Sequence, residues 1–412
     1  MNKRVTLLLN TFPSLSETFI LNQVVGLKKK GWEVQVISFK KPNMNRVHPD
    51  FYNFNCEEAW TVIGLPSSLS KRMVKGLGLF LKLFVKAPSL CLRALNKKKY
   101  RTAASSLKNL FILDKLVGQE IPLLHAHFGP NGLVGSFLKD VGIVDKLIVT
   151  YHGSDINSYP RRYGHDVYHH LYKKADLITA NTSFTKGKIT NNGADPDNIA
   201  ILPVGLNTTD YPLREDPPTE GLNGLRILTV GRLVEKKGYP WAIEAVGLLQ
   251  AEFPGLTYHI VGDGPMKEQL KALVSEKGLE SVISFCGSLN ADEVRQEFSQ
   301  AHVFVLASAI SADGDMEGQG LVLQEAQSMG VPVVSTLHNG IPDGVLDEES
   351  GFLVPEKNSQ ALADKISLLL KDRDLRVSMG KAGNSFVREN YDMSVLTDKL
   401  EKLYSSVTGE QG

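Results

Sequence analysis

Short apolar runs alternate with helix-like segments along the chain, and this alternation constrains the fold more than any other feature. The first apolar run, residues 5–9, is followed by a segment of helical composition that ends in three lysines before Gly31, and a second apolar run occupies residues 34–37. Short, bounded apolar runs are consistent with buried strands. A strand, a helix and a strand in this order predict two parallel strands joined by a crossover helix.

The same pattern recurs in two series separated by residues 207–224. We expect further strands at 123–127, 147–150, 177–180 and 199–202, and then at 226–230, 258–261, 282–285, 303–306 and 331–335. Residues 207–224 are polar, rich in proline and glycine, and aperiodic, which is typical of a linker. A chain of 412 residues has room for two to three domains with separate cores. The sequence therefore predicts two α/β halves.

Composition narrows the class of protein. The net charge of +1 gives no overall attraction to nucleic acid. Three cysteines, far apart and odd in number, favour a reducing compartment, and the sequence has no C-x-x-C pair or His/Cys cluster that would propose a metal. No run of 18 apolar residues occurs, and the first apolar run is too short for a secretory signal. We therefore expect a cytoplasmic protein.

Two carboxylates, Glu317 and Glu325, flank the predicted start of a helix over residues 321–329. Glu317 stands on a loop with Gly318 and Gly320, downstream of the strand predicted at 303–306. Unpaired N–H groups and a positive dipole at a helix start suit a phosphate or a sugar hydroxyl, and two carboxylates can accept hydrogen bonds from vicinal hydroxyls. The structural alternative is a helix N-terminus that simply favours acidic side chains.

A second glycine-bearing loop carries cations. Arg232 and Lys237 lie between Gly231 and Gly238, after the strand predicted at 226–230. A guanidinium fork and an ammonium group can neutralise a diphosphate there, although the same charges could simply be solvated. The pairs Gly262-x-Gly264 and Gly318-x-Gly320 lack the third glycine of a dinucleotide fingerprint, which argues against a hydride-transferring enzyme.

Polar residues also follow the predicted strands of the first half. His125 and His127 are two positions apart and project to one face of their strand, and His152 and Asp155 stand on the glycine-bearing loop after residues 147–150. Ligands bind at this end of the strands in open α/β sheets. The structural alternative for the first two is a half-buried strand end with one hydrogen-bonded imidazole.

The loop after the first strand contains Ser14, Ser16 and Glu17. Ser14 and Glu17 have the spacing of a capping box, which would fix the start of the first helix without any ligand. The same loop is also a place where such sheets bind ligands.

Residues 59–113 break the alternation, because they hold eleven Lys and Arg residues and no Asp or Glu. Lys75, Lys82 and Lys86 fall within about 40° of one another on an otherwise apolar helix. This pattern indicates an interfacial helix resting on anionic lipid, with a core helix bearing solvated lysines as the alternative.

These motifs together resemble one known family. Gly231-Arg-Leu followed by Lys237-Gly, Gly262-Asp-Gly-Pro, Glu317-x7-Glu325 and Gly-Val-Pro-Val-Val334, together with Tyr151-His-Gly-x-Asp155, are similar in order and spacing to family-4 retaining glycosyltransferases of the GT-B fold. Residues 12–20 and 317–326 resemble the corresponding segments of those family members that build bacterial exopolysaccharide, colanic-acid-type and capsular sugars. Two departures are Ser14-Leu-Ser16 in place of paired glycines and Asn339 to Asp343 in place of Gly-Gly-x-Pro-Glu.

The resemblance implies an α/β GT-B architecture with two Rossmann-like, doubly wound domains facing a central cleft. Its implied parts are an acceptor-binding domain over 1–206 with a basic apolar helical insertion at about 65–110, a linker over 207–224, a donor-binding domain over 225–390, and a C-terminal helix over 391–412 that packs back on the first domain.

The resemblance further implies a retaining, metal-independent hexosyltransferase. It would move a sugar from a nucleotide-diphosphate sugar to a growing, lipid-linked oligosaccharide in bacterial exopolysaccharide, capsule or lipopolysaccharide synthesis. Its partners would be the donor, a lipid-linked or soluble glycan acceptor and an anionic membrane surface through residues 71–101, with no nucleic acid, cofactor or metal. It would act in the cytoplasm, peripherally on the inner membrane face.

The family pattern also assigns roles to residues. Arg232 and Lys237 would hold the diphosphate in place of a metal, Glu325 the ribose hydroxyls, and Glu317 the donor sugar. His152 would approach that sugar from the first domain. The implied catalytic residues are His152, Glu317, Arg232 and Lys237. The implied donor-binding residues are Arg232, Lys237, Gly287, Leu289, Glu317, Gly318, Gln319, Gly320 and Glu325, with the backbone around 287–289 receiving the base. The acceptor-side candidates are Ser14, Ser16, His127 and Asp155.

Two other classes of function stay open on the sequence. A sugar-nucleotide epimerase or a phosphorylase could use the same fold and similar donor contacts, because fold does not dictate chemistry. A non-enzymatic sugar-binding protein is a third hypothesis, but such a protein has no need for the cations and both carboxylates together.

Overall fold

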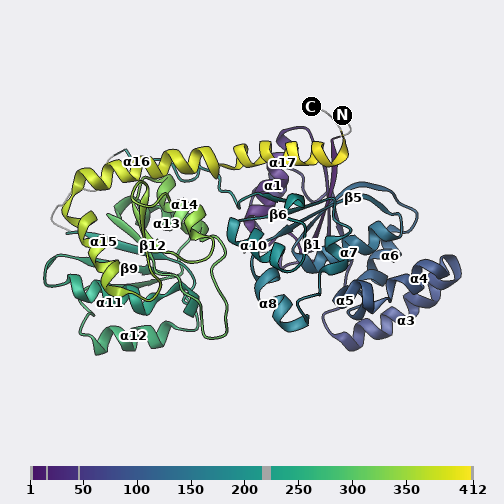
Figure 1. The fold of residues 1–412 in the computed structure, drawn as a ribbon, viewed down its shortest axis with the longest axis horizontal. Coiled ribbons are helices and arrows are strands. Elements are labelled where there is room, and N and C mark those ends of the chain that lie inside the picture. The colour runs from purple at the N-terminus through teal and green to yellow at the C-terminus, as the bar shows by residue number, and fades with distance from the viewer. Residues whose placement is uncertain (1–2, 15–16, 45–46, 216–223, 410–412) are drawn as a thin grey trace. The chain divides into compact units, whose positions relative to one another are not determined.

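The computed structural model describes residues 3–14, 17–44, 47–215 and 224–409. The chain forms two compact units, one made of Met1–Pro203 with Leu396–Gly412 and the other of Val204–Val395. Each unit contains one sheet with helices packed against it (Figure 1). The two units are described in turn.

The sheet of the first unit has seven strands in the order β3-β2-β1-β4-β5-β6-β7, and every neighbouring pair is parallel. The order reverses between β1 and β4, so the loops that follow these two strands diverge at that point. The strands are β1 (Arg4–Thr11), β2 (Glu33–Lys40), β3 (Trp60–Val62), β4 (Ile121–His127), β5 (Val144–Tyr151), β6 (Leu177–Ala180) and β7 (Ile199–Ile201).

Helices cover both faces of this sheet, and apolar side chains from strands and helices form its cores. Its helices are α1 (Thr18–Lys29), α2 (Asp50–Asn53), α3 (Leu69–Lys86), α4 (Pro88–Ala94), α5 (Lys97–Ser105), α6 (Lys108–Leu116), α7 (Gly129–Asp140), α8 (Ser154–Tyr163), α9 (His169–Tyr172) and α10 (Ser183–Asn191). The basic segment noted in the sequence corresponds to β3 and α3 to α6. Within the described residues, no helix combines the length and apolarity that crossing a membrane requires.

The last helix, α17 (Met393–Thr408), contributes to the first unit from Leu396 onward. The ring of Tyr404 packs edge-on against Trp32, and its hydroxyl lies 2.7 Å from Nδ1 of His125. Glu401 forms an ion pair of 2.7 Å with Lys3 and accepts a hydrogen bond from the indole of Trp32. Residues nearly 400 positions apart are therefore joined in one core.

The sheet of the second unit has six parallel strands in the order β10-β9-β8-β11-β12-β13, and its order reverses between β8 and β11. The strands are β8 (Arg226–Val230), β9 (Thr257–Val261), β10 (Ile283–Gly287), β11 (Val303–Leu306), β12 (Val333–Thr336) and β13 (Gly351–Val354). The helices are α11 (Tyr239–Leu249), α12 (Lys267–Glu276), α13 (Ala291–Gln300), α14 (Leu321–Ser328), α15 (Ser359–Lys371) and α16 (Arg373–Asn390). Two sheets of this kind confirm the predicted α/β class.

Three details differ from the sequence-based expectation. The strands β3 and β13 were not expected; β3 has only three residues, which is too short to establish a pattern. The capping box at Ser14 and Glu17 is wrong: α1 begins at Thr18, and Glu17 is its N-cap with no side-chain hydrogen bond. The N–H of Glu17 instead donates to the carbonyl of Ser14 over 3.2 Å.

The described part of the expected linker, residues 207–215, hydrogen-bonds within the second unit. The guanidinium of Arg214 donates to the carbonyls of Ala301 and Gly330 over 2.5 and 3.0 Å. The hydroxyl of Thr208 bonds to Asp392. The chain thus passes from the first unit to the second between Pro203 and Val204.

Candidate functional site

The loops that follow β8, β9 and β10 meet at one edge of the second sheet, because parallel strands share the direction of their carboxyl ends. The N–H of Gly231 donates to the carbonyl of Val261 over 2.9 Å, and the N–H of Gly262 donates to that of Gly287 over 2.7 Å. These main-chain bonds fix the three loops to one another.

Glycine is required where the loop after β8 lies on the end of β11. Gly238 has φ +68°, and a Cβ at this position would lie 1.7 Å from the carbonyl oxygen of Ala307. Only a residue without a side chain permits that approach. The cation-bearing loop is therefore held directly against the strand that precedes the carboxylate-bearing loop.

An ion pair joins these two loops. Nζ of Lys237 lies 2.6 Å from Oε2 of Glu317, and both side chains are largely buried. Burial alone would raise the pKa of Glu317, but the charge and hydrogen bond of Lys237 outweigh it, so the pKa lies below its ordinary value. The two residues are eighty positions apart in the sequence, and the structure brings them together where the strand order reverses.

The neighbouring charges brace the same two loops and leave one cation exposed. Lys236 pairs with Asp315 over 3.1 Å, and the carboxylate of Glu235 accepts from the N–H of Ala312 over 2.9 Å. Arg232 is exposed and forms no ion pair with any residue that the structure describes. An unpaired guanidinium thus lies on the same loop as a fixed ammonium group.

A buried histidine that the sequence did not single out orients Glu317. The N–H of Glu317 donates to Nε2 of His338 over 3.0 Å, and Nδ1 of His338 lies 2.6 Å from a carboxylate oxygen of Glu356. Because Nε2 accepts, the ring proton must be on Nδ1, where it donates to Glu356. The amide of Asn339 also donates to the carbonyl of Glu317 over 3.2 Å. Asn339 has φ +48°, a conformation that asparagine tolerates better than most residues.

Glu325 lies in α14 and is half-buried. Burial raises its pKa to about 7, although a hydrogen bond from Tyr211 and the charge of Lys237 oppose that shift. The helix begins after Gly320, which has φ +75°, and Gly318 precedes it on the loop. At neutral pH this carboxyl is therefore close to the midpoint of its titration.

Gln319 has a different environment from the one expected of a donor-binding side chain. Its amide oxygen accepts from the N–H of Val204 and its amide nitrogen donates to the carbonyl of the same residue, both over 2.8 Å. The side chain is buried and both of its polar ends are engaged. Only the main chain of Gln319 is left to contact a ligand.

Gly287 and Leu289 follow β10 at the same edge of the sheet. Gly287 has φ +71°, and a Cβ added at this position would have no other atom within 4 Å, so its surroundings are open. Leu289 packs in part against the apolar cluster that includes Leu323 of α14. Open backbone beside an apolar surface suits a flat heterocyclic ring.

In the first unit, three histidines are stacked at the carboxyl ends of β4 and β5. The rings of His125 and His127 are 4.4 Å apart, and Nδ1 of His127 lies 3.1 Å from Nε2 of His152. Phe19 and Phe128 flank His152 at 5.0 and 4.5 Å. Burial lowers the pKa of His127 to about 3 and also lowers that of His152, so both imidazoles are neutral near pH 7.

Two buried nitrogens of this stack point to a role beyond packing. Nε2 of His127 and Nδ1 of His152 have no hydrogen-bond partner among the described residues. His125, in contrast, is hydrogen-bonded at both nitrogens, to Tyr404 and Thr150. His125 therefore fits the structural alternative of a hydrogen-bonded imidazole at a strand end. His127 and His152 each keep one nitrogen available for a further hydrogen bond.

The carboxylate of Asp155 is hydrogen-bonded to the main chain. Its carboxylate accepts from the N–H groups of Gly129, His152 and Gly153 over 2.9 to 3.0 Å, and burial raises its pKa to about 6. It holds the histidine-bearing loop to the start of α7, which favours a positioning role. Ser14 precedes α1 at the end of the loop that follows β1, and Ser16 lies outside the described residues.

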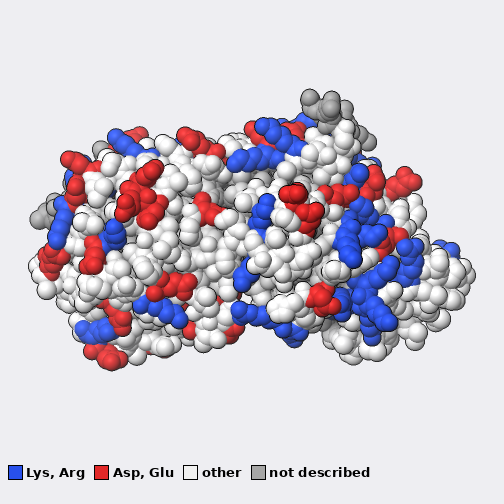
Figure 2. Space-filling view, viewed as in Figure 1, with Lys and Arg blue, Asp and Glu red and all other residues white. Residues whose placement is uncertain are grey.

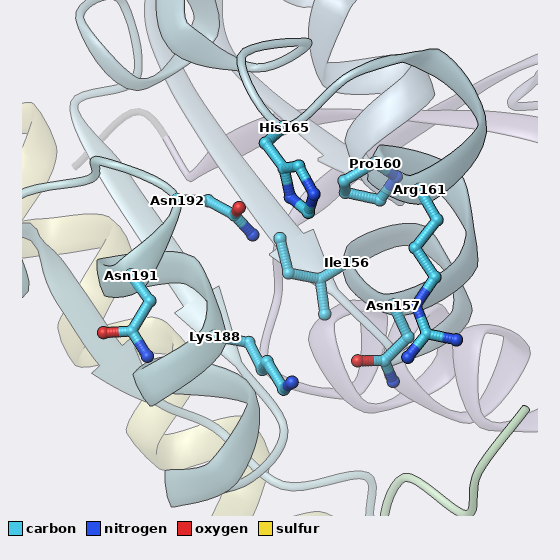
Figure 3. Close-up of a pocket in the computed structure, with 8 residues that line it drawn as sticks. All are labelled: Ile156, Asn157, Pro160, Arg161, His165, Lys188, Asn191 and Asn192. Atoms are coloured by element: carbon cyan, nitrogen blue, oxygen red, sulfur yellow. The ribbon is translucent and has the colours of Figure 1, made fainter. Parts of the chain in front are cut away.

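A separate pocket of about 260 Å³ lies between α8 and α10 of the first unit (Figure 3). The side chain of Ile156, from α8, lies in the middle of the drawn residues, most of which are polar or cationic. Its lining residues are Ile156, Asn157, Pro160, Arg161, His165, Lys188, Asn191 and Asn192. None of these was predicted from the sequence, because they come from segments without a recognisable motif.

A second unpredicted cluster joins His259, Cys286 and Glu297, whose ligand atoms lie within 4.8 Å of one another. Glu297 already bonds to Nδ1 of His259 over 2.9 Å, and the guanidinium of Arg226 lies 3.5 Å from the same oxygen. A permanent cation at this position disfavours a metal ion. The cluster is satisfied as a hydrogen-bonded structural group.

Comparisons with known proteins agree on one family. The model described as "Glycosyltransferase Family 4" matches residues 16–210, and the model described as "Glycosyl transferases group 1" matches residues 215–386. The colanic acid biosynthesis glycosyltransferase WcaL of Escherichia coli is 32% identical, with 98% of this chain and 100% of that protein covered. The chain belongs to the family-4 glycosyltransferases. The amylovoran biosynthesis glycosyltransferase AmsK of Erwinia amylovora is 28% identical over 92% of this glycosyltransferase and 91% of its own length.

Solved structures agree with the fold of this glycosyltransferase. A glycosyltransferase from Rickettsia africae aligns over all of both chains with a TM-score of 0.72 and 17% identity. Anabaena HepE in complex with UDP aligns over 98% of this chain and 100% of its own, with a TM-score of 0.71 and 18% identity. The predicted GT-B fold is therefore confirmed. This glycosyltransferase acts on a nucleotide sugar, belongs to a retaining family and is homologous to enzymes of exopolysaccharide biosynthesis.

The role of His338 leads to a testable prediction for this glycosyltransferase. His338→Ala leaves the buried N–H of Glu317 without an acceptor, which should cost about 1–3 kcal/mol of unfolding free energy. The Glu317 amide should also exchange its hydrogen faster, as measured by hydrogen–deuterium exchange. His338→Gln restores an acceptor and should recover part of both effects. The exposed His169→Ala serves as control, and equal protection of Glu317 in all three variants would contradict the role of His338.

Proposed function

We propose that this glycosyltransferase transfers a hexosyl group from a nucleotide-diphosphate sugar to a growing, lipid-linked oligosaccharide in exopolysaccharide, capsule or lipopolysaccharide synthesis. The observation that carries the donor side is the Lys237–Glu317 pair at the point where the strand order reverses, with Arg232 exposed on the same loop. Open α/β sheets bind ligands at this point.

The chemistry of the pair suits departure of a diphosphate. Breaking the bond between the sugar and the diphosphate leaves negative charge on the departing oxygen. Fixed cations therefore stabilise the transition state, in which this charge develops, more than the bound donor. Lys237 is already oriented by Glu317, and Arg232 is free to add a bidentate contact. Glu317, held by His338 and Asn339, then faces the sugar as a hydrogen-bond acceptor.

The remaining contacts to the donor would come from residues at the same edge of the second sheet. Glu325 accepts hydrogen bonds from the ribose hydroxyls, and the open backbone at Gly287 with the apolar side of Leu289 receives the base. Support for the donor class comes from relatives: HepE has been crystallised with UDP-glucose, and a Mycobacterium tuberculosis relative at 27% identity is named as GDP-mannose-dependent. We assign uridine or guanosine diphosphate sugars to this chain on that basis.

His152 and His127 supply the hydrogen-bonding groups of the first unit. Their free nitrogens lie on neutral rings, which can donate to or accept from sugar hydroxyls without a competing charge. No protein nucleophile is assigned, and the acceptor hydroxyl attacks from the side of the leaving group. The acceptor class rests on the names of the polysaccharide relatives WcaL and AmsK.

The experiment that tests this function is a screen of uridine- and guanosine-diphosphate sugars with and without a lipid-linked glycan acceptor. We expect one donor to yield free nucleoside diphosphate and a glycosylated acceptor in which the anomeric configuration is retained. Conversion of the donor to an isomer without any acceptor would identify an epimerase instead. Consumption of the donor only with inorganic phosphate would identify a phosphorylase.

Lys237→Ala should lower turnover by about 100-fold or more, because it removes charge from the leaving group. The exposed Lys271→Ala, whose cation pairs with Glu268 on α12, is the matched control and should keep normal turnover. Turnover is measured as release of nucleoside diphosphate at saturating donor. Near-normal turnover in Lys237→Ala and Arg232→Ala would contradict the diphosphate assignment.

The proposed reaction needs no divalent metal. Asp315 is occupied by Lys236, and Asp313 accepts from Ser311 and from the N–H of Asp315, so neither carboxylate is arranged for an ion beside the diphosphate. Transfer should therefore continue after dialysis against EDTA. Loss of transfer in EDTA, followed by recovery with manganese but not with zinc, would show that the cations are insufficient.

Glu325 should make donor affinity depend on pH. Its pKa of about 7 means that the carboxylate, the better acceptor for two hydroxyls, gains population as pH rises from 6 to 8. If only the ionised form grips the ribose, donor affinity rises about tenfold across that interval. Glu325→Gln should flatten the profile, whereas the exposed Glu349→Gln should not. Calorimetric titration with the donor measures both, and a flat profile for the unaltered protein would remove Glu325 from the ribose site.

A further inference from the structure

The helix α3 exposes an apolar face that no described residue covers. Eight of the seventeen exposed large apolar side chains among the described residues lie on α3 and α4. They are Leu69, Met73, Val74, Leu77, Leu81, Phe84, Val85 and Leu92, between 41 and 86% exposed. So large a group of exposed apolar side chains marks an interaction surface rather than ordinary surface scatter.

The eighteen residues of α3 fall into three lengthwise faces at about 100° per residue. One face, which includes Gly76 and Leu83, is buried against the first unit. A second face, from Met73 round to Val85, spans about 120° and is exposed and apolar. The third face consists of lysines at 71, 75, 82 and 86. The sequence predicted the lysine face, and the structure adds that the outward apolar face lies beside it.

Most of the lysines near this face have no ionic partner. Lys82 pairs with Asp114, and Lys99 lies 3.9 Å from Asp140. Among the described residues no ion pair is formed by Lys71, Lys75, Lys86, Lys97 or Lys98. These ammonium groups are therefore available to an external anion.

A basic recess continues the lysine surface. The helices α3, α4 and α5 all pack against α6, and only two residues separate α4 from α5. On α5 a hollow of about 390 Å³ is lined by Lys98, Lys99, Arg101, Asp166, His169, His170 and Lys173. In Figure 2 the surface over α3 and α4 is mostly white, and blue side chains gather beside it.

We propose that the exposed face of α3 and α4, with the lysines beside it, docks on a bilayer surface that contains anionic lipid. A helix with an apolar face, a lysine face and a third face packed on its own domain lies in the interface rather than across it. The lysines contact headgroups while Leu77, Leu81 and Val85 enter the boundary with the acyl chains. The basic recess on α5 adds sites for headgroup phosphates.

The charge distribution favours a bilayer over a second copy of the chain. An isologous contact through this face would place the unpaired lysines of one copy near those of the other, and like charges oppose such an association. Residues 59–113 contain no acidic side chain that could compensate. This inference rests on the exposed face alone and does not depend on the transfer reaction.

Flotation with phosphatidylcholine vesicles, with and without phosphatidylglycerol, tests the proposal on the full chain. We expect binding that requires the anionic lipid and weakens as salt is added. Lys71→Gln, Lys75→Gln and Lys86→Gln should each weaken partitioning about fivefold. Lys381→Gln, Lys399→Gln and Lys402→Gln, each made singly at an exposed position, are the charge-matched controls and should bind as the unaltered chain does.

The apolar part of the surface needs its own variant. Leu77→Asp with Leu81→Asp should reduce vesicle binding by about tenfold or more, since both side chains lose their apolar contact. Leu248→Asp with Leu368→Asp, which are 53 and 47% exposed on the second unit, is the matched control. Circular dichroism and thermal unfolding establish that each variant is folded.

Three results would overturn the proposal. The first is absence of binding to anionic vesicles at low salt by the unaltered chain. The second is full binding by the Leu77 and Leu81 variant. The third is self-association of the unaltered chain in sedimentation equilibrium, without vesicle binding, that the Leu77 and Leu81 variant abolishes. This result would identify the face as an interface between copies.

Discussion

Parallel pairing of every strand is the constraint on which both units depend. Because all strands in a sheet run in one direction, their following loops gather at one edge, and a reversal in strand order separates two neighbouring loops there. In the second unit that reversal lies between β8 and β11, which is where Lys237 and Glu317 meet. In the first unit it lies between β1 and β4, and the stacked histidines lie at the end of β4 and directly after β5. The site residues are distant in sequence because each loop is delivered by a different strand.

Electrostatics differ between the two units in a way that suits different tasks. The second unit keeps the carboxylate of Glu317 ionised by pairing it with Lys237, and it leaves Arg232 without an ion pair among the described residues. The first unit removes charge, since burial keeps His127 and His152 neutral. The second unit can therefore neutralise an added negative charge, and the first offers uncharged hydrogen-bonding nitrogens. Glu325 is the exception, because burial raises its pKa to about 7 and its charge therefore changes near neutral pH.

Much of the fold could be predicted from the sequence, because the buried parallel strands are apolar and the turns between them carry glycine. The runs at Leu177–Ala180 and Arg226–Val230 were located to the residue for this reason. The short edge strand β3 gave no such signal, since three residues cannot establish a pattern. In the site, glycine and charge marked Lys237 and Glu317, but His338 lacked any local motif. Its importance lies in a contact with a main-chain N–H twenty-one positions away, which side-chain identity alone does not reveal. Gln319 shows the converse case, in which a motif residue was predicted to bind the donor. Its place in the motif did not reveal that its side-chain amide is hydrogen-bonded to Val204.

The two hydrogen bonds between the amide of Gln319 and the main chain of Val204 link two parts of the second unit. Val204 is the first residue of the second unit, directly after the point where the chain leaves the first. The loop that carries Glu317 is thus tied by a two-sided amide contact to the stretch of chain that enters its unit. A displacement of this loop relative to Val204 stretches or breaks both amide hydrogen bonds. The position of a single glutamine side chain thus joins the glycine-rich loop to the point where the chain enters its unit.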